Sequence, residues 1–509
     1  MLSTVTRALP RHLWALAALT LLAAVLRFST LGMQSFWSDE TVTVLLVRMD
    51  FSDMLTMLSK SESTPPLYYV LGWPWTRAFG SDEIGLRSLS ALAGTAAVPI
   101  AFAAASILVS RRAAVATAAV VAVNPLLVWY SQEARAYALL VTLVALSFLL
   151  FVRALQDPTP GRLAAWSAAS ILALASHYFA AFAIVPAAFV LLVVRPGRAA
   201  LALAATLLGA AVLAPLALAQ RGTGSAEWIS RSPLDERIVI LVKQLLVGRN
   251  TPLDRPLAVA AALLVLAALV LLVLRGCQRN RRGAVVAAAV GLAALAAPVG
   301  LALLGFDYVI TQSALAAFIP LAVAGSAGFA VRVPRGIGSL ALASLCALSI
   351  VLVATVSLEP TYHRADWRGA ARAVGQADGN RIIVIDNDFG GWFARIPFQL
   401  YLPEARAVDR GLATVPQRFP LRLRRREQDH AAPSNVATRE IVFVNFTGES
   451  ACGIASPRLF GSFHLVEKRI SAGYSLHRYR SREPVAVAPR AIASGCLRSR
   501  EVAILVQDV

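Results

Sequence analysis

Residues 34–41 read Gln-Ser-Phe-Trp-Ser-Asp-Glu-Thr and place two adjacent carboxylates, Asp39 and Glu40, directly after the first long apolar segment. If that segment crosses a bilayer, the two carboxylates lie at a membrane surface behind the rings of Phe36 and Trp37. The alternative is that one of them only caps a short interfacial helix, because acidic side chains are favoured at helix N-termini. The side of the membrane that carries the other polar groups decides between these interpretations.

The composition indicates a membrane protein. The chain has 509 residues, of which 57% are hydrophobic and only 15% are charged, whereas a soluble domain is about a quarter charged. The apolar residues form repeated blocks long enough to span roughly 30 Å of hydrocarbon at about 1.5 Å per residue. The net charge of +19 comes largely from short arginine clusters between these blocks. The positive-inside rule explains such clusters, so we predict membrane lipids and not nucleic acid as partners.

Apolar blocks and arginine clusters together predict the topology. We expect the first block to be an uncleaved helix, because the apolar run continues past Leu26 without a convincing cleavage site. If every arginine cluster faces the cytoplasm, consecutive clusters are separated by an even number of crossings. The blocks lie at about 13–31, 88–109, 113–130, 136–152, 257–274, 284–305, 309–331 and 336–356, with three further crossings within 162–219.

Residues 64–80 are the ambiguous segment in this count. They are apolar but contain three prolines and two tryptophans. Proline removes a backbone bond that a lipid-facing helix needs, and tryptophan and tyrosine prefer the interface. Counted as juxtamembrane, this segment leaves every arginine cluster inside. We therefore predict eleven spans, with a cytoplasmic N-terminus and an extracytoplasmic C-terminus.

This topology gathers polar groups on one face of the membrane. The outer face carries the first loop, 32–85, the late loop, 220–256, and everything after 357. Polar groups that cluster at one face mark a site. At helix ends on this side lie Asp39, Glu40, Glu133, Arg135, His177 and Asp307.

The predicted domains are a transmembrane domain, residues 1–356, and a small mixed α/β extracytoplasmic domain, residues 357–509. Residues 367–374 read as a helix, and 381–385, 441–445 and 474–479 read as strands. The basic run Arg422 to Arg426 is either a solvated loop or a contact for anionic lipid or glycan. Cys452 and Cys496 can pair if this domain is extracytoplasmic.

Three motifs carry a resemblance to a known family. They are Trp37-Ser-Asp-Glu40, Thr64-Pro-Pro-Leu-Tyr-Tyr69 and Tyr130-Ser-Gln-Glu-Ala-Arg-Ala-Tyr137. In this order and spacing they resemble the polyprenyl-phosphate-sugar-dependent glycosyltransferases of the GT-C fold, in the branch with protein O-mannosyltransferases and the lipid A aminoarabinose transferase. The resemblance covers the first 200 residues and the general layout of the rest. It implies inverting transfer of one sugar from a polyprenyl-phosphate donor to a glycan, glycolipid or protein acceptor, at the outer face of a bacterial inner membrane.

The resemblance also implies roles for individual residues. Asp39 matches the general base, with Glu40 beside it orienting the acceptor or a cation. Glu133 matches a second acidic position that holds acceptor or metal. Relatives often have histidine or lysine where this chain has Thr64, and commonly arginine near the donor phosphate where this chain has Gln312. Both departures leave open which group neutralises the phosphate.

The residue chemistry is consistent with these roles. An aspartate with an ordinary pKa near 3.9 is ionised at neutral pH and can accept a hydroxyl proton as the new bond forms. Side chains adjacent in sequence diverge. Asp39 and Glu40 therefore do not suit a retaining pair, whose carboxyl groups flank one glycosidic bond about 5 Å apart. One base and inversion of configuration is the simpler prediction.

Several cations could bind the phosphate. We favour Arg231 and Lys243 because they lie in the late outer loop. Arg135 is as readily explained by pairing with a nearby carboxylate. The full set of outer-face cations considered is Arg48, Lys60, Arg135, Arg221, Arg231 and Lys243.

Three further residues have two interpretations each. His177 is either a structural residue at a helix end or a contact for acceptor or phosphate. With Glu133 it could hold a divalent cation, although two ligands do not specify a metal, and no cofactor is certain. Tyr68 and Tyr69 are either interfacial anchors or a surface on which a sugar ring stacks.

A membrane transporter or lipid flippase is the alternative function. Transporters place polar groups and broken helices near the membrane midplane, often in two repeated halves. Here the acidic groups lie at the ends of spans on one side, and the sequence has no detectable repeat. These features favour a transferase.

Overall fold

The computed structural model describes residues 10–222, 228–332, 336–386, 391–407, 435–446, 461–488, 492 and 503–507. The chain forms two compact units. The helical unit comprises residues 1–31 and 62–358, and the sheet unit comprises residues 32–61 and 359–509. Residues 32–61, which the apolar pattern grouped with the transmembrane domain, thus pack with the C-terminal region.

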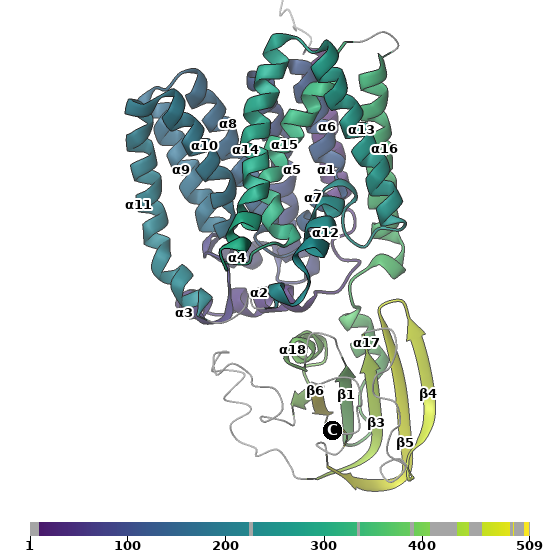
Figure 1. Ribbon diagram of the computed structural model, residues 1–509. Coiled ribbons are helices and arrows are strands. Elements are labelled where there is room, and N and C mark those ends of the chain that lie inside the picture. Colours follow the sequence, from purple (N-terminus) through teal and green to yellow (C-terminus); the bar gives the residue numbers. More distant parts are fainter. Residues whose placement is uncertain are drawn as a thin grey trace, which may run out of the picture. The chain divides into compact units, whose positions relative to one another are not determined.

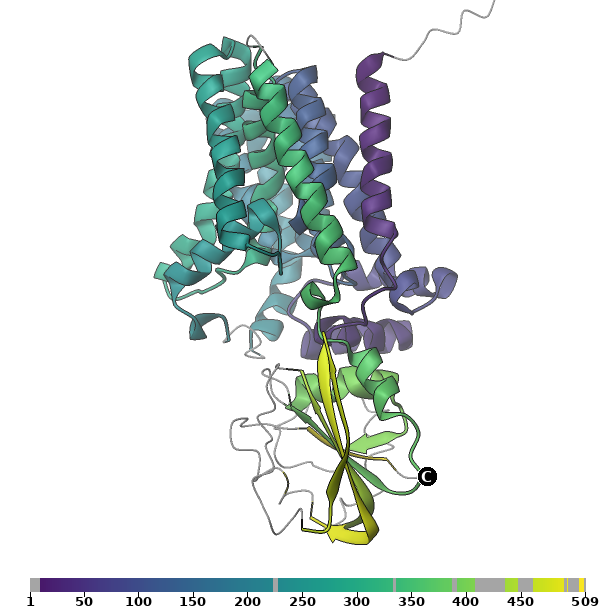
Figure 2. The same cartoon turned by 90° about the vertical axis from the view of Figure 1, so that its right-hand side faces the viewer.

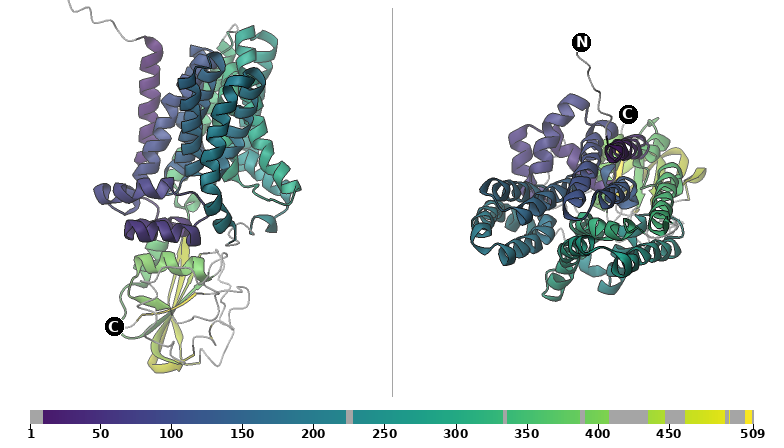
Figure 3. Two further views of the ribbon diagram at one scale, coloured as in Figure 1. Left: turned by 90° about the vertical axis from the view of Figure 1, so that its left-hand side faces the viewer. Right: turned by 90° about the horizontal axis from the view of Figure 1, so that it is seen from above.

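The helical unit is a bundle of long apolar helices (Figures 1 and 3). Within the described residues, eight helices are long and apolar enough to cross a membrane, or up to nine if the bent pair α6 and α7 is one span. Helices α9, α10 and α11 lie where three crossings were predicted within 162–219, so each of the predicted crossings has a helical counterpart. The polytopic helical fold class is confirmed. The helices are α1 (Arg11–Phe28), α4 (Leu67–Phe79), α5 (Glu83–Leu108), α6 (Arg111–Val123), α7 (Pro125–Ser131), α8 (Tyr137–Gln156), α9 (Pro160–Ser176), α10 (Ala181–Val194), α11 (Pro196–Arg221), α12 (Leu234–Val247), α13 (Asp254–Arg275), α14 (Gln278–Leu303), α15 (Thr311–Phe329) and α16 (Ile337–Leu358), with short 3₁₀ turns η1 (Tyr178–Ala180) and η2 (Ile229–Arg231).

Helix α4 is the ambiguous segment of the sequence count. It has 13 residues, with Pro74 inside, and at about 1.5 Å per residue it is about 20 Å long. That length is well short of the roughly 30 Å of a hydrocarbon core. Helix α4 therefore cannot cross a membrane by itself, and it lies at one end of the bundle (Figure 1).

The break between α6 and α7 is stabilised by a buried arginine. The two helices meet at an angle of 55°. Pro125 has no N–H, so the Val121 carbonyl loses its helical partner. Arg27 of α1 is fully buried and donates to the carbonyls of Val121 (3.0 Å) and Ala122 (2.7 Å). A break inside an apolar bundle is tolerated only when its freed carbonyls are satisfied in this way.

The two ends of the bundle differ in chemistry. The connections α5–α6, α8–α9, α10–α11 and α13–α14, which carry arginine clusters, lie at one end (Figure 1). Two adjacent hollows of about 420 and 380 Å³ open there, lined by Gln156, Arg153, Arg162, Arg279 and Arg282 among others. The turns α7–α8, α12–α13 and α14–α15 lie at the other end. These turns carry Glu133 and Asp307 of the helical unit.

The sheet unit contains a six-stranded mixed sheet in the order β2-β6-β1-β3-β5-β4. Strands β1 and β3 are parallel, and the other pairings are antiparallel. Strands predicted at 381–385, 441–445 and 474–479 and the helix at 367–374 are all present. Arg422 to Arg426, Cys452 and Cys496 lie outside the described residues. The elements are α2 (Ser38–Arg48), α3 (Phe51–Ser61), η4 (Pro360–Tyr362), α17 (Trp367–Val374), β1 (Arg381–Asp386), α18 (Gly391–Tyr401), β2 (Ala405–Ala407), β3 (Val436–Asn445), β4 (His464–Ser471), β5 (Tyr474–Val487) and β6 (Ala503–Gln507).

Helices α17 and α18 cover one face of this sheet (Figures 1 and 2). Strand side chains alternate between faces, so Ile383 and Ile385 pack with Trp367 and Phe398 on the helix side, while Ile382 faces the opposite cluster. The core of the unit is therefore divided by the sheet into two apolar layers.

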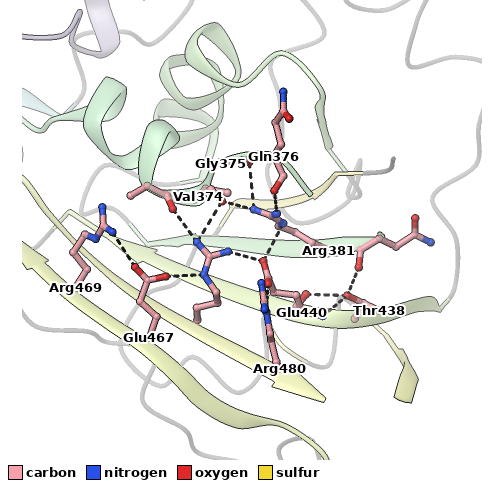
Figure 4. Close-up of polar contacts among 12 residues, drawn as sticks. Val374, Gly375, Gln376, Arg381, Thr438, Glu440, Glu467, Arg469 and Arg480 are labelled. Atoms are coloured by element: carbon pink, nitrogen blue, oxygen red, sulfur yellow. Dashed lines mark hydrogen bonds and ion pairs between the residues drawn. The ribbon is translucent and has the colours of Figure 1, made fainter. Parts of the chain in front are cut away.

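A buried carboxylate joins α17 to the sheet (Figure 4). Glu440 of β3 accepts hydrogen bonds from Arg478 (2.6 Å) and Arg480 (2.7 Å) and lies 3.1 Å from Nε of Arg381. Arg478 also donates to the carbonyl of Ala373, 2.8 Å away, at the C-terminal end of α17. A guanidinium at this end of a helix complements the helix dipole.

The pKa of Glu440 predicts how the stability of the sheet unit changes at acid pH. Burial acts to raise this pKa, but the hydrogen bond from Arg480 and the charges of Arg381 and Arg478 outweigh it, and the pKa lies below its ordinary value. The stabilisation is therefore present above the unfolded-state pKa and is lost as the pH falls through the lower folded-state pKa.

Breaking a buried ion pair costs about 3–5 kcal/mol. We expect Glu440→Gln to lower the thermal midpoint at pH 7 and to flatten the acid part of a plot of midpoint against pH. The exposed Glu483, changed to Gln, is the control, and a Glu440→Gln profile that follows the wild type would contradict the assignment.

Candidate active site

Asp39 and Glu40 begin helix α2 and have different surroundings. Glu40 is fully buried, and its carboxylate accepts a hydrogen bond from the backbone N–H of Trp37 at 3.2 Å. It therefore caps the N-terminus of α2, as the alternative interpretation of this stretch expected for one of the two acids. Asp39, half-buried in the same first turn, points in another direction, because successive helical side chains diverge by about 100°. The two adjacent acids therefore have different surroundings, and only Glu40 caps α2 through its side chain among the contacts that the structure describes.

In the helical unit, Glu133 lies in the turn between α7 and α8. Asn124 precedes this segment and caps α7, since its side chain accepts from the N–H of Leu127 at 3.1 Å. Gln132 then fixes the turn to the end of α1 through the Leu26 carbonyl (2.9 Å). Glu133 itself is 1% exposed. The turn therefore holds a carboxylate inside the end of the bundle.

Arg135, two residues on, makes a buried bidentate ion pair. Its guanidinium donates to the two carboxylate oxygens of Glu62 at 2.7 and 2.9 Å, and also to the hydroxyl of Tyr69 at 3.1 Å. Both charged side chains are at least 93% buried. Of the two roles considered for Arg135, the structure shows pairing with a carboxylate, and the partner is Glu62. This geometry commits the guanidinium to holding residues 62–69 against the α7–α8 turn.

Tyr68 and Tyr69 belong to the same network. Tyr69 lies 3.2 Å from the Thr64 hydroxyl, and Tyr68 lies 2.9 Å from that of Ser90. Both tyrosines are at most 1% exposed. Neither ring is therefore available as a surface anchor in this arrangement, and neither presents a face for a sugar.

His177 ends helix α9 as a structural residue would. Its Nδ1 accepts a hydrogen bond from the N–H of Phe179 at 3.2 Å. Its ring lies between those of Tyr137 and Phe179, with centroid separations of 5.7 and 4.5 Å. This contact occupies the nitrogen that caps η1, so the structural interpretation of His177 accounts for its position.

The metal-binding prediction for Glu133 and His177 receives no third ligand. Within the described part of the chain, no group of three or more His, Cys, Asp or Glu side chains could hold a metal ion. Two side chains do not specify a metal, since Zn²⁺ sites use three or four protein ligands whereas Mg²⁺ sites use one or two carboxylates with water and phosphate. The metal site at Glu133 and His177 stays a prediction.

Arg231 and Lys243, the two cations favoured from the sequence for the donor phosphate, do not lie in the turn that carries Glu133. Lys243 forms an ion pair with Asp254 at the start of α13. Arg231 is exposed at the end of η2, and Gln312 is half-buried in the first turn of α15. The acidic Asp307 is held by a residue that was not considered from the sequence, Arg237, whose two donors reach it at 2.8 and 2.7 Å.

Arg249 is the cation beside the acidic turn, and it was not among the cations considered from the sequence. Its Nη1 donates to the hydroxyl of Tyr130 at 3.1 Å. Its pKa lies above the ordinary value because Tyr130, and more weakly Glu133 and Tyr137, favour the charged form more strongly than burial opposes it. The buried Nε of Arg249 has no hydrogen-bond partner among the described residues. The Nε–H of Arg249 is therefore removed from water without a hydrogen-bond acceptor among the described residues. An unsatisfied buried donor costs free energy, and a ligand that accepts this hydrogen bond would remove the cost.

The loop that carries Arg249 has an unusual backbone. Gly248, Asn250 and Leu253 all adopt positive φ, at 83°, 53° and 47°. A side chain at Gly248 would approach Pro125 to 2.7 Å, so the loop passes directly against the α6–α7 break. Glycine adopts positive φ freely and asparagine tolerates it. Leu253 is the strained residue of the three, and such strain is concentrated at functional sites. The sequence signal that could have found Arg249 is the run Gly-Arg-Asn at 248–250 inside the late outer loop.

Comparisons with known proteins agree with this architecture. Residues 63–219 match the sequence profile of a family described as dolichyl-phosphate-mannose-protein mannosyltransferase. No curated protein matches the chain in sequence. Among solved structures, the chain is similar to apo ArnT from Cupriavidus metallidurans, with 12% identity, a TM-score of 0.58 and coverage of 92% of this chain and 98% of that one. The same ArnT bound to undecaprenyl phosphate gives a TM-score of 0.54 at the same identity and coverage.

A third similar structure is the arabinofuranosyltransferase AftD from Mycobacteria. It is 17% identical, has a TM-score of 0.48, and the match covers 93% of this chain and 40% of AftD.

Proposed function

We propose, from the premise that this chain is a membrane glycosyltransferase of the GT-C fold, that it moves one monosaccharide from a polyprenyl-phosphate donor to an envelope glycan, glycolipid or protein. The similarity to ArnT confirms the predicted fold. The family match over residues 63–219 agrees with the predicted transferase class. The donor and acceptor are the parts that we propose. One of the two similar ArnT structures has undecaprenyl phosphate bound, which supports a lipid phosphate as the leaving group.

The observation that carries the proposal is the arrangement of Arg249, Tyr130 and Glu133. A lipid-phosphate leaving group needs a cation where its charge develops. Arg249 supplies one whose Nη1 is fixed on Tyr130 and whose Nε is buried without a partner among the described residues. Arginine binds phosphate in a bidentate manner. We assign the donor phosphate to this guanidinium, with Tyr130 as a hydroxyl donor beside it.

The proposed reaction uses Asp39 as the base. The acceptor hydroxyl gives its proton to the Asp39 carboxylate while its oxygen bonds to the anomeric carbon of the donor. The bond between that carbon and the phosphate oxygen breaks, and polyprenyl phosphate leaves with the electron pair. A phosphate is a stable leaving group, so no strong general acid is required. One displacement inverts the anomeric configuration. Glu133 is assigned to acceptor contact.

A transfer assay tests the proposal directly. Purified protein in lipid vesicles is incubated with a polyprenyl-phosphate-linked mannose or pentose, the sugars that we favour, together with membrane extract as the acceptor source. We expect release of polyprenyl phosphate coupled to glycosylation, with an inverted linkage. Movement of the lipid between leaflets with no sugar transferred would support a flippase or transporter instead.

The orientation in the membrane is also a proposal. We place the protein in a bacterial inner membrane as a multi-pass chain, with the N-terminus cytoplasmic and residues 357–509 extracytoplasmic. The arginine-bearing connections at one end of the bundle support this orientation through the positive-inside rule. Glu133, Arg249 and Asp307 then belong to the extracytoplasmic end.

Cysteine labelling tests the orientation. Cys277 is exposed in the α13–α14 connection, and Arg231 is exposed in the late loop. With Cys346, Cys452 and Cys496 replaced by serine, we expect Cys277 to react with a membrane-impermeant maleimide only after the cells are permeabilised. In the same background with Cys277→Ser, an Arg231→Cys variant should react in intact cells. The opposite pattern would invert the topology.

A further inference from the structure

The segment that leads to Asp39 has no regular structure, and its partners lie in the C-terminal region. Residues 29–37 connect α1 to α2 without helix or strand. Polar groups of such a connection still need hydrogen bonds when they are buried. Six consecutive residues, Gly32 to Trp37, have such partners or a ring contact in the C-terminal part of the same compact unit.

Two of these contacts come from arginines near the start of α17. Arg368 donates through one Nη2 to the carbonyls of Gly32 (2.8 Å) and Met33 (3.1 Å). The backbone N–H of Arg364 donates to the side chain of Gln34 at 3.1 Å, and the Arg364 guanidinium lies 5.8 Å from the centre of the Trp37 ring.

The remaining contacts involve Ser35 and Phe36, both 2% exposed. The Ser35 hydroxyl donates to the Ala365 carbonyl and accepts from the N–H of Trp367, each at 3.1 Å. The N–H of Phe36 donates to the hydroxyl of Tyr401 at 2.7 Å. Ser35 thus inserts into the entry of α17, and Tyr401 of α18 satisfies the next backbone donor.

The groups that make these contacts are themselves fixed to the sheet. Asp366 caps α17 by accepting from the N–H of Gly369 at 2.9 Å, and its own N–H donates to the Gly473 carbonyl in the β4–β5 turn. A side chain at Gly473 would approach Asp366 to 2.8 Å. Trp367 lies in the apolar core, and Tyr401 packs against that core. The entry of α17 and Tyr401 therefore form a platform for the segment, and the sheet and its apolar core hold this platform in place.

We propose that the C-terminal domain is a positioning element for Asp39, with Arg368 and Tyr401 as the positioning residues. The inference rests on the proposed role of Asp39 as the base. Asp39 follows Trp37 by two residues, so a platform that fixes residues 32–37 also fixes the start of α2. A catalytic group needs supports that hold it within about 0.5 Å. The sheet domain supplies that support from more than 300 residues away in sequence.

Paired variants test the inference. Tyr401→Phe removes one hydroxyl, and Arg368→Gln removes the donor to two carbonyls. The controls are Tyr474→Phe, in the same apolar core, and Arg372→Gln, an exposed arginine one turn along α17. For Tyr401→Phe and Arg368→Gln we expect kcat to fall about 10- to 100-fold, since a misplacement of about 1 Å can cost about 10²-fold. The KM for the donor should change little, Arg368→Lys should restore part of kcat, and both controls should resemble the wild type.

Hydrogen exchange of the peptide 32–41 provides a readout that does not depend on activity. We expect faster exchange in Tyr401→Phe and Arg368→Gln and wild-type exchange in the controls. Unchanged exchange, or faster exchange with an unchanged kcat, would overturn the positioning role while leaving the proposed function intact. Equal losses of kcat in variants and controls would also overturn it. Full transfer activity in Asp39→Asn would instead remove the proposed base, whatever the exchange data show.

Discussion

Replacement of Asp39 by asparagine is expected to lower kcat for sugar transfer by about 10²- to 10⁴-fold, the usual contribution of a general base. Asparagine keeps the shape of the side chain and removes only the ability to accept a proton. The KM for the lipid donor should stay near the wild-type value, because we assign donor binding to Arg249. Steady-state rates with purified protein and a polyprenyl-phosphate sugar measure both constants.

Two neighbouring acids serve as controls for Asp39. Asp53 lies exposed in the first turn of α3, in the same compact unit, and Asp53→Asn should leave the rate unchanged. Glu40→Gln keeps a side-chain oxygen that can accept from the N–H of Trp37, because glutamate and glutamine both serve at this position of a capping box. It should therefore lower kcat far less than Asp39→Asn does. A normal rate in Asp39→Asn, or a larger rate loss in Glu40→Gln, would mean that the wrong carboxylate has been chosen.

The membrane architecture could be predicted from sequence because its physical requirement is local. A segment in lipid must satisfy its own backbone within one helix and needs about 20 apolar residues. Both conditions can be seen in a window of that size. The three prolines in 64–80 indicated a segment unable to span, and α4 has only 13 residues.

The roles of individual polar residues could not be predicted in the same way, because their partners are distant in sequence. Glu62 stands in the polar run Lys-Ser-Glu-Ser, where nothing marks it as the buried partner of Arg135, 73 residues away. Lys243 was favoured for its loop, but it pairs with Asp254. A charged side chain pairs with the opposite charge that the fold brings near it, and that partner can lie anywhere in the sequence.

The division of the chain into two units could not be predicted either, because it also depends on contacts between residues distant in sequence. Apolar periodicity separates residues 1–356 from the polar tail, and it contains no information on where the loop 32–61 packs. The Ser35–Ala365 hydrogen bond joins residues 330 positions apart. The motif Trp37-Ser-Asp-Glu40 could thus be recognised by its chemistry, while the groups that hold it were not recognisable.

Arg249 gives the second large expected effect. We expect Arg249→Gln to weaken binding of polyprenyl phosphate by about 10- to 150-fold, because a hydrogen bond to a charged group contributes about 1.5–3 kcal/mol and about 1.4 kcal/mol corresponds to a tenfold change. Arg249→Lys should recover part of this loss, since lysine keeps the charge but not the bidentate geometry. Titration of the purified protein with undecaprenyl phosphate, followed by native mass spectrometry, measures the binding without requiring sugar transfer.

Comparison with Arg231 makes this prediction specific. Arg231 lies in the same late loop and was favoured from the sequence, but it is exposed, so Arg231→Gln should change binding by less than about threefold, as expected for an exposed charge. Tyr130→Phe removes the hydroxyl that fixes Arg249 and should weaken binding less than Arg249→Gln does. The reverse order, with Arg231→Gln the weaker binder, would assign the phosphate to the loop surface. Arg249 is a better phosphate site than the exposed Arg231 for two reasons. Its buried Nε is already without water, so the phosphate displaces none there. The fold has also already compensated the free-energy cost of burying the charge.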